Sequence, residues 1–187
     1  SENTAIMTAF DLCRNPPNDI DTARHMLNEA GWKSTKDASV LALYNAIFAF
    51  NFDARDLDYT YSNAGFMAGS ILGNSALGSD QIGVQSGGIK LALVGLPEGT
   101  PYCVITGPEF LQQTLNETQE YNALMRQASA VLTQETGRFH DHFVAGVARF
   151  EISELEAVLS ASSIPSDRVT KILSITNPVT IQIISSE

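Results

Sequence analysis

Two cysteines that lie 90 positions apart constrain the fold of this chain of 187 residues more than any other feature. Cys13 and Cys103 are its only cysteines, and no metal-binding or redox motif surrounds either one. They are therefore either two inert buried thiols or one disulfide, and a disulfide would place the protein outside the cytoplasm. Cys13 falls near the end of a predicted helix and Cys103 in a predicted strand. A bond between them requires the N-terminal helices to pack directly on a sheet.

The composition is that of an acidic globular protein. Apolar residues make up 44% of the chain and charged residues 17%, and this combination argues against disorder. Twenty-one acidic and 11 basic residues give a net charge of −10, and the basic residues do not form a run. Such a surface repels polyanions, so we expect neither nucleic acid nor an anionic membrane as a partner. A basic partner protein or a cationic ligand is easier to accommodate.

The first part of the chain, about residues 1–78, is predicted to be helical. Apolar residues at helical spacing indicate a helix that ends at Asn15-Pro16-Pro17, and a second helix that ends at Gly31. Gly31 occupies the position of a left-handed C-cap, and Trp32 is placed to fold back on Leu27. Ser34 and Asp37 resemble a capping box that opens a third, buried helix.

The second part, about residues 79–187, is predicted to mix strands and helices. Residues 89–96 and 102–106 form a hairpin, residues 109–135 one long helix, and residues 139–150 a further strand. Two short helices and a terminal strand that begins near Val179 complete the pattern. The fold class is therefore α+β, with N-terminal helices packed on a mostly antiparallel sheet of four or five strands, in a single domain over residues 1–187.

Nine of the 13 glycines lie between residues 65 and 99. Gly65, Gly69 and Gly73 recur every four residues, which on a helix makes a smooth face for close packing, either within the protein or in a homodimer. The later glycines of this region are expected in loops and turns.

The polar cluster His140-Asp141-His142 offers the clearest candidate chemistry. In a strand the two imidazoles point to one face and can supply two nitrogen ligands to zinc or copper, with Asp141 or Glu151 completing the site. The alternative is a solvated strand end. Ser75 lies in a segment similar to a nucleophile elbow, but the second glycine is one residue too far away. The alternative there is a glycine-rich helix end.

No motif for a cofactor is present. Ser86-Gly87-Gly88 does not spell a phosphate loop, and no glycine-rich dinucleotide fingerprint occurs between a strand and a helix. We therefore expect no cofactor. No stretch of the sequence reaches the length of apolar residues that a membrane-spanning helix needs.

Several short motifs together resemble those of uncharacterised exported bacterial proteins. They are Phe10-x-x-Cys13 in the opening helix, the helix end at Gly31-Trp32, and Tyr102-Cys103-Val104 in a later strand. The resemblance implies an envelope or secreted location, with two cysteines suited to pairing. Few lysines beside many Ser, Thr, Asn and Gln residues are also usual in exported bacterial chains, and the start at Ser1 fits either a processed or a trimmed chain.

The sequence thus favours a non-catalytic domain, periplasmic or secreted, that binds a partner protein or a small ligand. The alternative to the periplasmic or secreted location is a cytoplasmic protein with two free thiols. The alternative to the non-catalytic binding role is a hydrolase or metal-dependent enzyme that uses His140 and His142.

Overall fold

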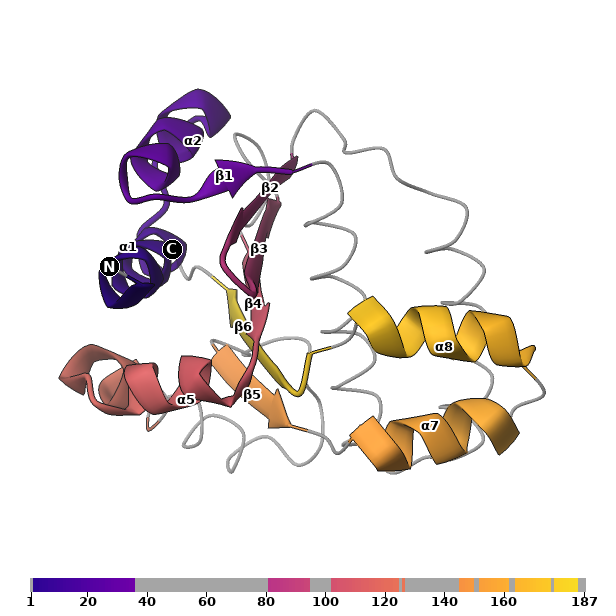
Figure 1. Ribbon diagram of the computed structural model, residues 1–187. Coiled ribbons are helices and arrows are strands. Elements are labelled where there is room, and N and C mark those ends of the chain that lie inside the picture. The colour runs from indigo at the N-terminus through magenta and orange to yellow at the C-terminus, as the bar shows by residue number, and fades with distance from the viewer. Residues whose placement is uncertain are drawn as a thin grey trace.

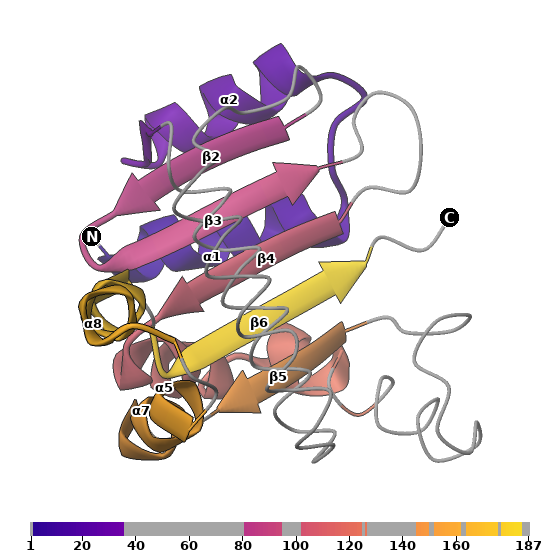
Figure 2. The same cartoon turned by 90° about the vertical axis from the view of Figure 1, so that its right-hand side faces the viewer.

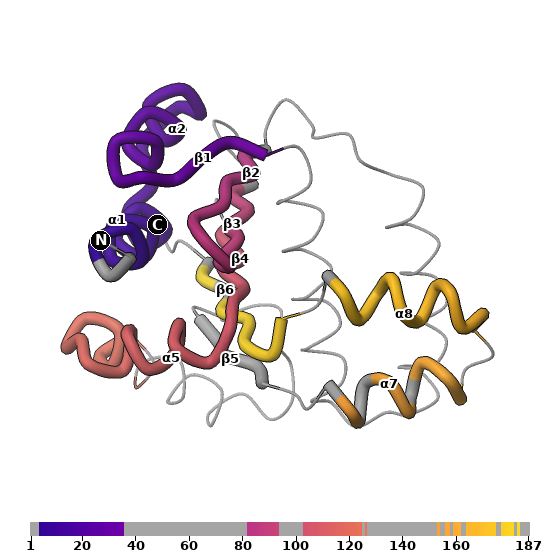
Figure 3. Tube along the Cα trace, viewed as in Figure 1, coloured from indigo at the N-terminus to yellow at the C-terminus, as the bar shows by residue number. Residues whose placement is uncertain are grey.

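The computed structural model describes residues 2–35, 81–94, 102–124, 126, 145–149, 152–161, 164–175 and 177–184. Three layers are visible in these residues, with helices on both sides of a central sheet (Figures 1 and 3). The helices are α1 (Glu2–Arg14), α2 (Ile20–Glu29), α5 (Glu109–Asn116), α7 (Ile152–Ala161) and α8 (Ser166–Ile175). The strands are β1 (Lys33–Ser34), β2 (Gln81–Ser86), β3 (Ile89–Val94), β4 (Tyr102–Gly107), β5 (Ala145–Arg149) and β6 (Val179–Ile184).

The strands form one sheet in the order β1-β2-β3-β4-β6-β5, and every neighbouring pair is antiparallel (Figure 2). The α+β class and the antiparallel sheet are therefore confirmed. The predicted hairpin is β3 and β4, and the terminal strand β6 is inserted between β4 and β5. None of the helices in the described ranges combines the length and the apolar character of a membrane span.

Strand β2 was not predicted, and Gly83 within it was wrongly expected in a loop or turn. Gly83 is buried and pairs with Ala92 of β3. Its strand carries few apolar residues, and a glycine at its centre weakens the sequence signal for a strand. The hairpin turn lies instead at Gly87-Gly88, where Gly87 has a φ of 58°.

Helix α2 ends at Gly31 as the sequence predicts, and Asp19 caps its first turn. The carboxylate of Asp19 accepts hydrogen bonds from the backbone N–H and the hydroxyl of Thr22, both at 2.8 Å. These bonds, led by that from the backbone N–H, lower the pKa of Asp19. At the other end Gly31 has a φ of 99° and donates to the carbonyl of Asn28, while Trp32 N–H donates to the carbonyl of Leu27. This pair of bonds is a Schellman motif.

Trp32 joins the first two helices. Its side chain is buried, and its indole N–H donates to the backbone carbonyl of Ala5 in α1 at 2.9 Å. Trp32 and Leu27 both lie in the buried core, and the backbone N–H of Trp32 bonds to the carbonyl of Leu27. The indole also fixes how α2 crosses α1, because a buried N–H needs a partner.

The single long helix that was expected from residue 109 is wrong in one respect, because α5 ends at Asn116 and the chain becomes helical again at residue 119. Thr118 causes the break. Its hydroxyl donates to the carbonyl of Leu115 at 2.8 Å and accepts from the backbone N–H of Tyr121 at 3.3 Å. Thr118 therefore ends one helix and caps the next.

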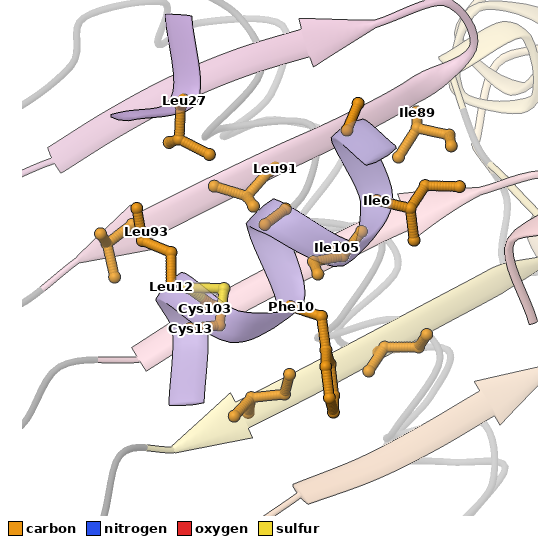
Figure 4. Close-up of a cluster of buried hydrophobic side chains, with 14 of the residues drawn as sticks. Ile6, Phe10, Leu12, Cys13, Leu27, Ile89, Leu91, Leu93, Cys103 and Ile105 are labelled. Atoms are coloured by element: carbon orange, nitrogen blue, oxygen red, sulfur yellow. A yellow bond between two sulfur atoms is a disulfide. The ribbon is translucent and has the colours of Figure 1, made fainter. Parts of the chain in front are cut away.

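Helices α1, α2 and α5 cover one face of the sheet, which we call the clamped face (Figure 1). Helix α1 lies across β3 and β4, and a sulfur–sulfur bond joins Cys13 to Cys103 beneath it (Figure 4). The Cα atoms of the two cysteines are 5.6 Å apart. The sheet residues of this core are all apolar: Ile82, Val84, Ile89, Leu91, Leu93, Cys103, Ile105, Val179, Ile181 and Ile183.

The opposite face, which we call the small-residue face, is built from smaller or more polar side chains. Its buried members include Gly83, Ala92, Val104, Thr106 and Thr180. The hydroxyl of Thr106 donates to the carbonyl of Val179 at 3.2 Å, and the hydroxyl of Thr180 donates to that of Thr106 at 3.4 Å. These bonds satisfy two buried hydroxyls in the centre of the sheet. The pair also shows that β6 is buried on both faces here.

Candidate functional site

Helices α7 and α8 lie on the side of the sheet away from the clamped face (Figures 1 and 2). They form a hairpin whose apolar residues include Leu159, Val169 and Ile172, all buried. The first turn of α8 is closed by the carbonyl of Pro165, which accepts from the backbone N–H groups of Arg168 and Val169 at 3.0 Å each. These bonds set the direction in which α8 leaves the connecting loop.

A groove of about 280 Å³ runs between the two helices, and we call it the α7–α8 groove. It is lined by two residues of α7, one of the connecting loop and four of α8. They are Glu156, Ser160, Ile164, Ser166, Val169, Thr170 and Leu173.

The lining combines apolar and polar groups. Ile164, Val169 and Leu173 supply an apolar wall, while Ser160 and Thr170 supply hydroxyl groups. The hydroxyl of Thr170 donates to the backbone carbonyl of Ser166 at 3.0 Å, so its oxygen lone pairs remain for a ligand to use. Apolar contact with a few placed polar groups is the ordinary composition of a binding pocket.

The ionisable groups of the described lining come down to one carboxylate, that of Glu156. This lining contains neither histidine nor cysteine. Within the described ranges no three side chains of His, Cys, Asp or Glu gather as a group that could hold a metal ion. The described groove residues offer apolar contact, hydroxyl hydrogen bonds and one carboxylate.

The candidate catalytic residues lie outside the described residues. This is so for His140, Asp141 and His142, for Ser75, for Glu151, and for the glycine face of Gly65, Gly69 and Gly73. The metal and hydrolase hypotheses therefore stay predictions. Metal analysis of the purified protein, with a His142→Ala variant as control, tests the first of them, and absence of bound metal together with no metal-induced thermal shift would count against it.

The remaining histidine, His25, lies on the exposed surface of α2. Its Nε2 atom is 3.2 Å from a carboxylate oxygen of Glu29, one helical turn further on, and both side chains are about 70% exposed. This pair is a solvent-exposed contact of α2, the kind that contributes little to stability.

The two cysteines are brought together as the sequence allows. Both are buried, at 2% exposure for Cys13 and 0% for Cys103, and no cysteine of the chain is free. Their surroundings are the apolar core of the clamped face, so the disulfide is a structural bond between α1 and β4.

The sequence predicts the two short helices but not the groove between them. The sequence does contain one sign of the groove, which is a pair of polar residues at helical spacing beside each apolar stripe. Glu156 and Ser160 are four residues apart on α7, and Ser166 and Thr170 are four apart on α8, so each pair shares a face. Which faces meet depends on how the hairpin packs, and that is a property of the tertiary structure.

Comparisons with protein-family models, with curated proteins and with solved structures found no match to this chain.

Proposed function

We propose that this protein is a non-catalytic domain, periplasmic or secreted, that binds a partner protein or a small ligand in the α7–α8 groove. The observation that carries the proposal is the division of the molecule into a cross-linked core on one side of the sheet and an open groove on the other.

The Cys13–Cys103 disulfide supports the location. Disulfides form and persist in oxidising compartments and are rare in the cytosol. The bond lies within an extensive apolar core, so it adds stability to a fold that already buries many large side chains. Additional cross-linking of this kind suits a protein that works without the chaperones and reductants of the cytoplasm.

The groove supports the binding role. It is concave and partly apolar, and its hydroxyl and carboxylate groups face a ligand from two helices. Its volume of about 280 Å³ is near the lower end of the range for small-molecule pockets, about 300–1,000 Å³. A short segment or a single side chain of a partner fits such a site better than a large cofactor.

The location is tested by separating native cells into fractions and unfolding each in a denaturant that contains a thiol-alkylating reagent and no reductant, because both cysteines are buried in the folded protein. The mass of the protein from each fraction is then measured. We expect the protein in the envelope or secreted fraction, unlabelled until a reductant is added. A Cys13→Ala variant, which leaves one thiol that must label after unfolding, shows that the reagent reacts. Two labelled cysteines in protein from the cytoplasmic fraction would contradict the proposal.

The binding role is tested by blocking the groove. Ser160→Trp places a large side chain in the groove, whereas Ser153→Trp places the same side chain on another exposed position of α7. We expect a partner or ligand from the envelope fraction to be retained by the wild type and by Ser153→Trp, and to be lost from Ser160→Trp. Equal retention by all three proteins would place binding elsewhere.

A further inference from the structure

We infer that the occupant of the α7–α8 groove is a cationic group on an apolar stem, such as the lysine side chain of a partner protein. The inference rests on the proposed function, because it names the chemistry of the partner at the same groove.

The apolar wall fits the stem. Ile164, Val169 and Leu173 all line the groove, and Val169 retains only 6% of its exposure. Lysine side chains bury their methylene stems along apolar surface while the charged end stays in contact with water or with polar groups. A groove of this size, open to solvent, accommodates such a stem without enclosing the ammonium group.

The charge in the groove fits a cation. Glu156 is the one charged residue of the described lining. The lining residues of α8 share one helical face, and at about 100° per residue Arg168 and Lys171 point to other faces of that helix. The basic residues of α8 therefore do not neutralise Glu156. The net charge of −10 adds a long-range attraction for a basic partner.

The hydrogen-bonding groups fit an ammonium in particular. An ammonium has three donors and no acceptor, so it needs oxygen lone pairs around it. Glu156 supplies carboxylate oxygens. Thr170 supplies a hydroxyl oxygen whose own hydrogen is already donated to the carbonyl of Ser166. The groove thus presents carboxylate and hydroxyl oxygens to an ammonium, whereas the charge of Glu156 would repel an anionic ligand.

The test is a titration followed by backbone amide NMR shifts, with N-acetyl-lysine methylamide as the probe and N-acetyl-norleucine methylamide as its uncharged counterpart. We expect the lysine probe to shift the resonances of α7 and α8 and to bind several-fold more tightly than the norleucine probe. Added salt should weaken the lysine probe and leave the norleucine probe unchanged.

Two variants sharpen the result. Glu156→Gln keeps the shape of the side chain and removes its charge, and should weaken the lysine probe by roughly two- to five-fold, the size expected for a solvent-exposed ion pair. Glu120→Gln removes the same charge from an exposed position outside the groove and should change nothing. Equal binding of both probes, an unchanged Glu156→Gln variant, or shifts confined to other elements would each overturn the inference.

Failure here is distinct from failure of the proposed function. A groove that prefers norleucine overturns the cationic occupant, while a partner lost from Ser160→Trp still upholds binding at the groove. Free thiols in the cytoplasmic fraction overturn the proposed location whatever the probes show.

Discussion

The two faces of the sheet differ in what covers them and in how firmly it is attached. On the clamped face, large aliphatic side chains of the four strands β2, β3, β4 and β6 pack against α1, α2 and α5, and a disulfide ties α1 to β4. On the small-residue face, Gly83, Ala92 and the pair Thr106–Thr180 take the place of those large side chains. The hairpin of α7 and α8 lies on that side and carries the groove.

The difference indicates that the two faces contribute unequally to the stability of the fold. Burial of large apolar side chains is the main source of stability in a domain of this size, and the clamped face supplies most of it among the described residues. Elements that bind ligands are drawn from the less stable parts of proteins, because they must adjust to an occupant. The α7–α8 hairpin therefore suits binding, while the clamped face holds the fold.

Removal of the disulfide should have the largest effect on the clamped face. A Cys13→Ala/Cys103→Ala variant should lose about 4 kcal/mol of unfolding free energy, because the chain-entropy model gives about 4.5 kcal/mol for a loop of this length and measured losses run from about 2 to 5 kcal/mol. Urea unfolding of the variant and of the wild type at one pH measures the loss. A loss below about 1 kcal/mol would show that the clamp contributes little.

A pair of leucines compares the packing on the two sides directly. Leu27 on α2 and Leu159 on α7 are both at 0% exposure. Leu27→Ala should cost about 3 kcal/mol and Leu159→Ala about 2 kcal/mol, because a cavity beside an open groove collapses more easily than one inside a cross-linked core. Thermal and urea unfolding of both variants measure the difference. Equal costs, or a larger cost for Leu159→Ala, would remove the distinction in rigidity.

The first two helices of the clamped face are among the elements that the sequence predicts best. Pro16 and Pro17 stop α1, Asp19 caps α2, and Gly31 ends it, so each boundary has a local chemical cause. Strand β2 was missed because Gly83 stands at its centre. That glycine is compatible with a strand only through its pairing with Ala92, a contact that depends on the hairpin.

Two features, one on each side of the sheet, were less predictable for a physical reason. The break after α5 arises from two hydrogen bonds of the Thr118 hydroxyl, and an apolar stripe that runs through it gives no sign of the break. The groove arises from the packing of α7 on α8, which brings Glu156 and Thr170 to one concave surface. Residue type and spacing place each side chain on a helical face, but the choice of facing partner is made by the tertiary structure.

A matched pair of glycines tests how far the end of α2 is fixed by backbone conformation. At Gly31 an added Cβ atom meets nothing within 4 Å, yet its φ of 99° strains any residue with a side chain. At Gly88 the same atom meets only the Cδ atom of Pro108 at 4.0 Å. Gly31→Ala should cost about 1–2 kcal/mol of unfolding free energy and Gly88→Ala less than about 0.5 kcal/mol. Equal costs would contradict the assigned role of the left-handed cap.

The smallest effect concerns a polar atom on the otherwise apolar clamped face. Tyr121 packs edge-on against Phe10, with ring centroids 5.8 Å apart, and its buried hydroxyl has no hydrogen-bond partner in the part of the chain described. Tyr121→Phe keeps the ring contact and removes the unpaired hydroxyl, so its unfolding free energy near neutral pH should be unchanged or up to about 1 kcal/mol higher.

The same residue makes this comparison dependent on pH. Burial raises the pKa of Tyr121, so the folded protein holds its phenolic proton more tightly than the unfolded chain does. The stability that results is present in full below the pKa of the tyrosine in the unfolded chain, about 10. It is lost as the pH rises through the higher pKa of Tyr121 in the folded protein. Wild type should therefore lose more stability than Tyr121→Phe between about pH 8 and about pH 11, as measured by urea unfolding at a series of pH values. Parallel pH profiles of the two proteins would show that the phenol is solvated, and that the clamped face is less tightly closed around α1 than its burial indicates.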